Sequence, residues 1–196
     1  MRSETTSFKI KIPHPIKDER YKEASLSKIQ DLTTEQAEKL KAWIYDPKHF
    51  LFLHSDYGVG KTYIASAIAN FFYANYVPTY FFNEHELYAM LKSEETDSRC
   101  AYGKLKSICD NDIVVWDDFG STMQNGKNDF NENAKKNFMF QFIDDRYNSK
   151  KPTIITTNFS VSQLAEIVNH RIASRINAKE NLIIELFGED KRQLGL

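Results

Sequence analysis

The residues with the clearest chemical potential form a short loop between an apolar run and an alanine-rich stretch. The loop reads Ser55, Asp56, Tyr57, Gly58, Val59, Gly60, Lys61 and Thr62. Its two glycines let the backbone turn and approach a ligand where a Cβ would obstruct it. A loop in this position can aim its N–H groups at phosphate oxygens, and the helix that follows adds its positive N-terminal end. The pattern predicts a phosphate-binding loop in which Lys61 reaches the β- and γ-phosphates and the Thr62 hydroxyl binds Mg²⁺.

One position departs from the usual form of this loop, because the first residue is Ser55 where glycine is common. Taken alone, the segment is therefore also consistent with an ordinary turn. The apolar run before it and the helical stretch after it favour the phosphate-binding interpretation.

A second set of candidate residues is the acidic pair Asp117 and Asp118, which directly follows the apolar run 113–116. A strand that ends this way places both carboxylates at the carboxyl edge of a sheet, where α/β proteins bind ligands. Asp117 is suited to holding Mg²⁺ and Asp118 to orienting or deprotonating an attacking water. The alternative is a solvated turn after a core strand.

Two further features could complete a phosphoryl-transfer site. Asn158 is the last residue of the polar triplet that ends the expected strand at 153–156, and its amide could position the lytic water or the γ-phosphate, although such a turn is common. Arg171 and Arg175 are four residues apart, so they share one helical face and could reach the γ-phosphate of a neighbouring subunit. A solvated or ion-paired helix face is an equally good interpretation of their spacing.

Apolar runs of strand length alternate with helical patterns along the chain, which predicts a parallel sheet covered by helices on both faces. The expected strands are 50–54, 79–82, 113–116, 153–156 and 182–186. One helix is expected to begin near Thr33 or Thr34. The other expected helices span 63–76, 84–92, 102–109, 134–148 and 161–168. Residues 121–131 are predicted to form one long polar loop.

Composition is that of an ordinary globular protein. The 196 residues include 26 Lys and Arg against 27 Asp and Glu, and 41% are hydrophobic. We expect one domain: a polar arm at 1–20, a core at 21–187 and a tail at 188–196. No apolar run reaches the roughly 18 residues that a membrane helix needs, so we expect a cytoplasmic protein with no membrane partner. Cys100 and Cys109 are expected to be reduced thiols.

The order of these motifs resembles that of AAA+ ATPases, and more narrowly the DnaC/DnaI-type replicative helicase loaders, with the IstB-type transposition ATPases as close relatives. The resemblance covers roughly residues 12–187. It is carried by three stretches: Tyr57-Gly-Val-Gly-Lys-Thr-Tyr-Ile-Ala, Val115-Trp-Asp-Asp-Phe-Gly, and Phe142-Ile-Asp-Asp-Arg-Tyr running into Lys151-Pro-Thr-Ile-Ile-Thr-Thr-Asn.

The resemblance implies a P-loop NTPase fold of the AAA+ type and specific roles for the candidate residues. Lys61 and Thr62 would contact phosphate and Mg²⁺, and Asp117 with Asp118 would form the Walker B pair. Asn158 would be sensor 1, and a neighbour's Arg175, with Arg171 next, would be the arginine finger. Few residues follow the last expected strand, so no helical lid domain is expected. Only about twenty polar residues precede the core, so the separate helicase-gripping domain of the loaders is not expected.

The function implied is ATP binding and hydrolysis, slow in a lone subunit and completed by self-association through the ATP site. The expected partners are a hexameric replicative helicase and single-stranded DNA. Two alternatives stay open: a transposition-accessory ATPase, and a nucleotide-gated adaptor with little turnover. For DNA contact the candidate groups are Lys104 and Lys106 near Tyr102, or Lys127, Lys135 and Lys136, each also consistent with a solvated helix face.

Overall fold

A computed structural model describes residues 13–30, 32–92, 98–123 and 130–191. Its centre is a sheet of five parallel strands in the order β2-β3-β4-β1-β5. The strands are β1 (Phe50–His54), β2 (Thr79–Asn83), β3 (Ile113–Asp117), β4 (Thr153–Thr157) and β5 (Leu182–Glu185). The predicted α/β class with a parallel sheet is confirmed.

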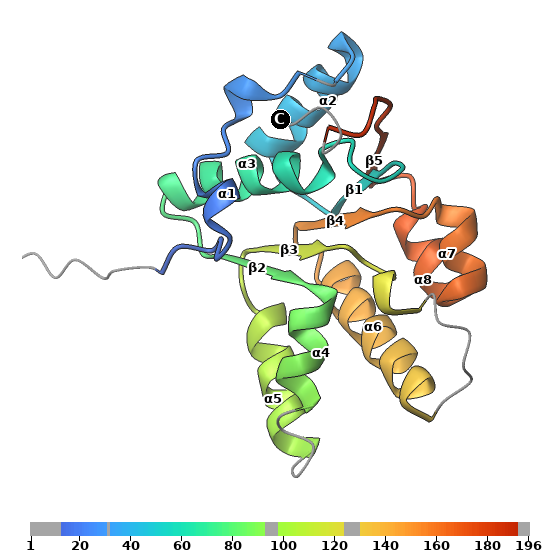
Figure 1. Cartoon of the computed structure of the whole chain (residues 1–196). Helices are drawn as coiled ribbons and strands as arrows, with labels where there is room; N and C mark the ends of the chain where they lie inside the picture. Colours follow the sequence, from blue (N-terminus) through green and yellow to red (C-terminus); the bar gives the residue numbers. More distant parts are fainter. Residues whose placement is uncertain (1–12, 31, 93–97, 124–129, 192–196) are drawn as a thin grey trace, which may run out of the picture.

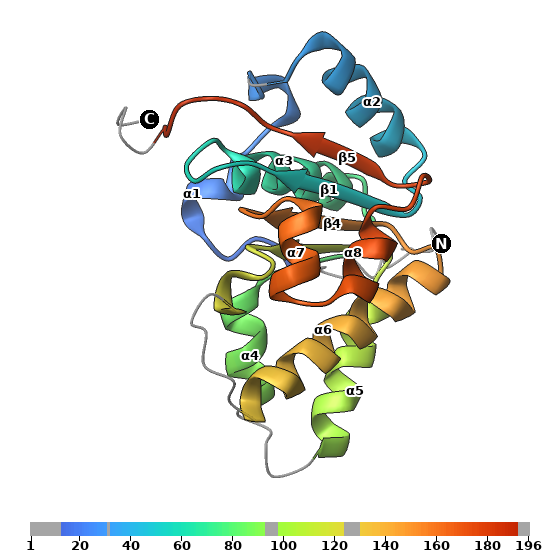
Figure 2. The same cartoon turned by 90° about the vertical axis from the view of Figure 1, so that its right-hand side faces the viewer.

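Helices cover both faces of this sheet, as expected (Figure 1). On one face lie α1 (Glu19–Lys22), the 3-10 helix η1 (Leu26–Lys28), α2 (Thr34–Tyr45) and α3 (Lys61–Ala74). On the other lie α4 (Glu84–Lys92), α5 (Ser98–Cys109), η2 (Ser121–Met123), α6 (Phe130–Asn148), α7 (Val161–Ile167) and α8 (His170–Ile176). Figure 2 shows the same layers from the side, with α2 beyond β5 and α4–α6 on the opposite face. Within the described residues, no helix is long and apolar enough to cross a membrane.

The core has two halves because neighbouring strand residues point to opposite faces of the sheet. In β1, Leu51 and Leu53 pack with α2 and α3, whereas Phe50 and Phe52 pack with α6 to α8. All four side chains are fully buried, as a central strand of a parallel sheet requires. The strands are parallel, so the carboxyl ends of β1, β3 and β4 lie together at one edge of the sheet.

The first described residues are tied to the core. Ile16 is 2% exposed and packs in the half of the core formed by α2 and α3. The Asn70 side-chain amide on α3 donates to the carbonyls of Tyr21, Lys22 and Ala24 at 3.1, 3.0 and 2.9 Å. Residues 16–24, of which 16–20 were expected to belong to a polar arm, therefore lie against α3.

The helix boundaries differ from the predicted ones in ways that local chemistry explains. Thr33 begins α2 as the N-cap, in a capping box with Gln36. Helix α3 begins at Lys61 instead of 63, because Gly60 has a φ of 108° and acts as its N-cap. It ends at Ala74 instead of 76, and Tyr76 has a φ of 60°, which is not helical. Helices α5 and α6 each begin four residues earlier than expected, at Ser98 and Phe130.

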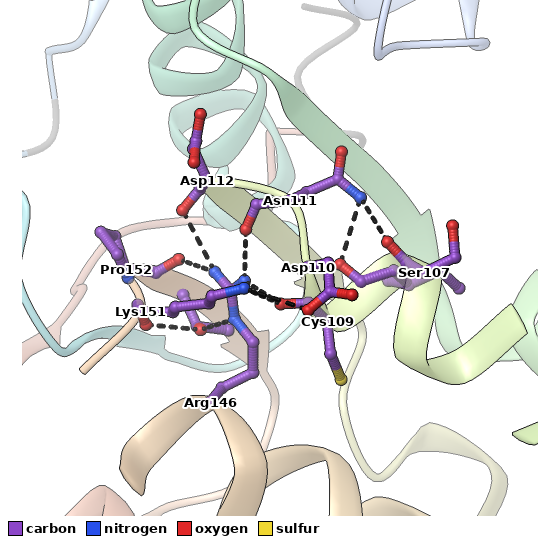
Figure 3. Close-up of polar contacts among 10 residues, drawn as sticks. Ser107, Cys109, Asp110, Asn111, Asp112, Arg146, Lys151 and Pro152 are labelled. Carbon is purple, nitrogen blue, oxygen red and sulfur yellow. Dashed lines mark hydrogen bonds and ion pairs between the residues drawn. The ribbon is translucent and has the colours of Figure 1, made fainter. Parts of the chain in front are cut away.

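At the amino ends of β3 and β4, one buried arginine ties several main-chain segments together (Figure 3). Arg146 of α6 is fully buried and donates to the carbonyls of Cys109, Asn111, Asp112 and Pro152, and to the Thr153 hydroxyl. Burial lowers the pKa of its guanidinium to about 10, so the group stays charged at neutral pH. These contacts align the starts of two adjacent strands at the edge opposite their carboxyl ends.

Candidate nucleotide-binding site

The loop Ser55–Thr62 follows β1 at the carboxyl edge of the sheet, and its last two residues, Lys61 and Thr62, are the first two of α3. Gly58 and Gly60 have φ values of 78° and 108°, in the region that favours glycine. Gly60, as the N-cap of α3, supplies no side-chain hydrogen bond to the first N–H groups of the helix. A helix start of this kind can bind an anion through its first N–H groups and the positive end of its dipole.

Lys61 lies inside the loop and is 6% exposed. Its ammonium donates to the Ser55 carbonyl at 3.1 Å, the Ser55 hydroxyl at 2.9 Å and the Asp56 carbonyl at 2.7 Å. Two main-chain carbonyls and one hydroxyl therefore hold the ammonium at the centre of the loop. The structure therefore brings Lys61 and the helix N-terminus together at one place, where a phosphate would meet both.

Asp117 ends β3 and faces the second residue of α3. The Thr62 hydroxyl lies 3.1 Å from each oxygen of its carboxylate, and the Thr156 hydroxyl of β4 donates to one of them at 2.6 Å. Burial and the nearby Asp118 raise the pKa of Asp117 to about 6. Carboxylate and hydroxyl oxygens are ligands that Mg²⁺ accepts, so Asp117 and Thr62 are a suitable pair of donors.

Asp118 follows with a φ of 56°, in the left-handed region that residues with a side chain adopt infrequently and aspartate more often than most. Its N–H donates to the Thr156 hydroxyl at 3.0 Å, and the next N–H, of Phe119, donates to the Thr156 carbonyl at 2.8 Å. Asp118, Asp117 and Thr62 line a polar pocket of about 190 Å³. The acidic pair therefore faces a common space with Thr62, the last residue of the loop, and with residues of the segment 16–21.

Asn158 lies just beyond the carboxyl end of β4, on the same edge, and is partly exposed. Among the described residues, no side-chain hydrogen bond reaches it. The residues of β4 that contact the acidic segment are instead Thr156, which bonds to Asp117 and Asp118, and Thr157. The Thr157 hydroxyl donates to the Phe119 carbonyl at 2.6 Å. Neither threonine is predicted to have a role from the sequence, where the available signal is two hydroxyl residues at the end of a strand with an apolar centre.

Arg171 and Arg175 share one face of α8, as their spacing predicts. Arg175 forms an ion pair with Asp144 of α6, and its guanidinium lies 4.8 Å from the centre of the Phe140 ring. The Arg171 guanidinium lies 5.7 Å from the same ring. Within the described residues, neither arginine contacts the loop of its own subunit, so the structure does not bring them together with Lys61.

The segment after β5 lies against the loop, a contact that the sequence did not indicate. The Lys191 N–H donates to the Gly58 carbonyl at 3.1 Å. A Cβ on Gly58 would lie 1.8 Å from an oxygen of Asp190, so the absence of a side chain there makes room for this carboxylate. The expected tail at 188–196 thus includes residues that pack on the candidate site.

The residues considered for DNA contact are divided between two helices. Lys104 and Lys106 lie on α5, and Lys135 and Lys136 lie on α6. The Lys135 ammonium lies 4.9 Å from the centre of the Tyr88 ring, and Lys136 pairs with Glu132 at 2.7 Å. Lys127 and the side chain of Tyr102 lie outside the described part of the chain.

Comparison with known proteins found one matching family model and several similar solved structures. A family model described as "IstB-like ATP binding protein" matches residues 9–176. The structure of DnaI is similar with a TM-score of 0.68 and 25% identity, over 88% of this chain and 93% of that one. The DnaC helicase loader gives a TM-score of 0.71 and 23% identity, over 87% and 100%.

A third similar structure is replication initiator DnaA bound to AMPPCP and single-stranded DNA. It shows 14% identity and a TM-score of 0.70, over 91% of this chain and 55% of that one, so it bears on the fold alone. No curated protein matches the sequence. The family model spans most of the chain and includes both the loop and the acidic pair. The chain therefore belongs to the family of IstB-like ATP binding proteins and has the AAA+ fold of the DnaI and DnaC structures.

Proposed function

We propose that the chain binds ATP with Mg²⁺ at the loop Ser55–Thr62 and hydrolyses it. The observation that carries this proposal is the contact of the Thr62 hydroxyl with both oxygens of Asp117, 3.1 Å away across the pocket. The residues fit the ligand, because the start of α3, where Gly60 gives no side-chain cap, and the buried Lys61 ammonium supply positive charge beside two hard oxygen donors. Membership of an ATP-binding family supports the same assignment.

Each candidate residue has a role that its position allows. The Lys61 ammonium leaves its contacts with Ser55 and Asp56 to bind the β- and γ-phosphates. Thr62 and Asp117 hold Mg²⁺, which when bound neutralises charge on the phosphates. Asp118 orients the attacking water, and Asn158, partly exposed at the end of β4, hydrogen-bonds the water or the γ-phosphate.

A neighbouring subunit completes the site with an arginine. Arg175 is the first candidate, since Asp144 and the Phe140 ring hold its guanidinium at one place on α8, and Arg171 is the second. An arginine supplied in trans stabilises the charge of the transition state. A lone subunit then hydrolyses ATP slowly, and turnover per subunit rises with protein concentration.

The proposed cellular role is loading or remodelling of a hexameric replicative helicase on single-stranded DNA. Similarity to DnaI and to the DnaC helicase loader over most of both chains supports it. The IstB-like family favours a second candidate, an accessory ATPase of transposition. A nucleotide-gated adaptor with little turnover is the third, and it predicts partner binding that survives Asp118→Asn.

The test has two parts, one for the site and one for the partner. Asp118→Asn and Arg175→Ala are each expected to be inactive, while a mixture of the two regains part of the activity through interfaces that hold an intact Asp118 and an intact Arg175. A mixture that stays inactive contradicts completion in trans. The partner is then tested by the mass, from light scattering on a sizing column, of the chain mixed with the host's replicative helicase, with and without Mg-ATP. A stable complex supports the helicase-loading role. Two separate peaks under both conditions favour the transposition or adaptor role.

A further inference from the structure

Glu84, the first residue of α4, is a fully buried carboxylate that the proposed chemistry does not use. It accepts hydrogen bonds from the Gly120 N–H at 2.5 Å, the Thr122 N–H at 3.0 Å and the Thr122 hydroxyl at 2.6 Å. Within the described residues it forms no ion pair with lysine or arginine. Burial raises the pKa of this carboxyl above its ordinary value. Burying a carboxyl group without a cation beside it is unfavourable for folding. The three neutral donors around Glu84 therefore indicate that a carboxyl group has a specific role at this position.

The three donors belong to the turn that follows Asp118 and to η2, which continues directly from it. This turn contains two residues with positive φ, Asp118 at 56° and Gly120 at 83°. The Ser121 N–H donates to the Asp118 carbonyl at 3.1 Å and closes the turn. The conformation of Asp118 is therefore coupled through the main chain to the position of Gly120.

Two elements hold this turn from opposite sides. On one side, β4 contacts its start through Thr156, which accepts from the Asp118 N–H, and through Thr157, which donates to the Phe119 carbonyl. On the other side, Glu84 holds its end at Gly120 and Thr122. Asp117 has separate contacts, with Thr62 and Thr156, that do not involve Glu84.

We propose that Glu84 is a positioning residue, which holds the turn after β3 so that the Asp118 carboxylate faces the attacking water. The inference rests on the proposed function, in which Asp118 orients that water. Loss of Glu84 then reduces turnover while ATP binding is retained, because the loop and Asp117 keep their own contacts. Replacing a residue that served only the stability of the fold would lower turnover and ATP binding together.

The test compares Glu84→Gln with wild type and with Glu35→Gln, an exposed glutamate in the first turn of α2. Glutamine keeps an oxygen for Thr122 but turns an NH₂ toward the Gly120 N–H, so two donors face each other. We expect kcat to fall by about tenfold or more, as small misplacements of catalytic groups do. The Kd for ATP should change by less than about threefold. The reason is that Glu84 hydrogen-bonds to Gly120 and Thr122, which have no proposed contact with the phosphates. Glu35→Gln should match wild type in both.

Thr122→Val is the second variant, because it removes one hydroxyl donor and leaves the carboxylate and the main chain in place. It should lower kcat several-fold with an unchanged Kd, and it decides the question if Glu84→Gln does not fold. Wild-type kcat in these variants, or a parallel loss of kcat and of ATP affinity, overturns the inference. Asp118→Asn is measured alongside. If it keeps full turnover, the proposed role of Asp118 is wrong. If it is inactive while Glu84→Gln is active, only the role of Glu84 is rejected and that of Asp118 stands.

Discussion

Replacing Arg146 with methionine should destabilise the fold without changing the chemistry of the site. The guanidinium is the shared donor for four main-chain carbonyls and one hydroxyl at the amino ends of β3 and β4 (Figure 3). Methionine preserves most of the side-chain volume but donates nothing. The carbonyls of Asn111, Asp112 and Pro152 then lose their Arg146 donor.

The magnitude follows from how many of these groups water can reach. Leaving a buried acceptor unpaired costs about 1–3 kcal/mol. The contacts to Asn111, Asp112 and Pro152 are only partly buried, so water replaces part of the loss, and the Cys109 carbonyl keeps the Lys151 ammonium at 3.0 Å. Relief from burying a charge offsets some of the remainder. We therefore expect a loss of about 3 kcal/mol in the free energy of unfolding.

The assay is urea unfolding followed by circular dichroism, with thermal unfolding as a second measure. For a chain of this size, about 3 kcal/mol corresponds to a decrease of roughly 6–12 °C in Tm. Lys151→Met is the matched control, because it removes one half-exposed donor from the same cluster and should cost less than about 1 kcal/mol. A loss below about 1 kcal/mol in Arg146→Met, or equal losses in both variants, would refute the reasoning.

Three further predictions concern single positions. Gly58→Ala should lower the free energy of unfolding by about 1–2 kcal/mol in thermal unfolding, because alanine is strained at a φ of 78°. Adding Asp190→Gly removes the clash between the new Cβ and the Asp190 carboxylate, but it should restore only part of the loss because the backbone strain remains. Thr156→Val should cost about 2–3 kcal/mol in urea unfolding and weaken Mg²⁺-dependent nucleotide binding, because the ionised Asp117 loses a donor at 2.6 Å; an unchanged midpoint contradicts it. Cys109 should resist iodoacetamide at pH 8 in the folded protein, since burial raises the pKa of its thiol to about 12, and peptide mass spectrometry would show modification only after unfolding.

The strands were predictable from the sequence because each is a short apolar run with polar residues at its ends. The register then followed, since the end of a parallel strand lies beside the ends of its neighbours: Asn83 is paired with Asp117, and His54 with Thr157. The loop and the acidic pair meet for this reason. Local patterns were sufficient for this part of the site.

The residues that hold the acidic pair were not predictable in the same way. Glu84 looks like an ordinary acidic residue at a helix start, and only the fold brings it to Gly120, 36 positions along the chain. Thr156 contacts Asp117 from 39 positions away, and Asp190 reaches Gly58 from the segment after β5. Such contacts depend on tertiary packing, which leaves no periodic or local signal in the sequence.

Calorimetric titration of Mg-ATP into the full chain, with Lys61→Met alongside, decides whether the loop Ser55–Thr62 is the ATP site. Lys61 is expected to supply charged hydrogen bonds to the phosphates, so its loss should weaken binding by about 100-fold. The wild type should bind one ATP per chain with micromolar affinity, and circular dichroism should show that the variant is folded. Equal affinity in the two proteins, or no heat of binding in the wild type, would contradict the assignment of this loop as the nucleotide site.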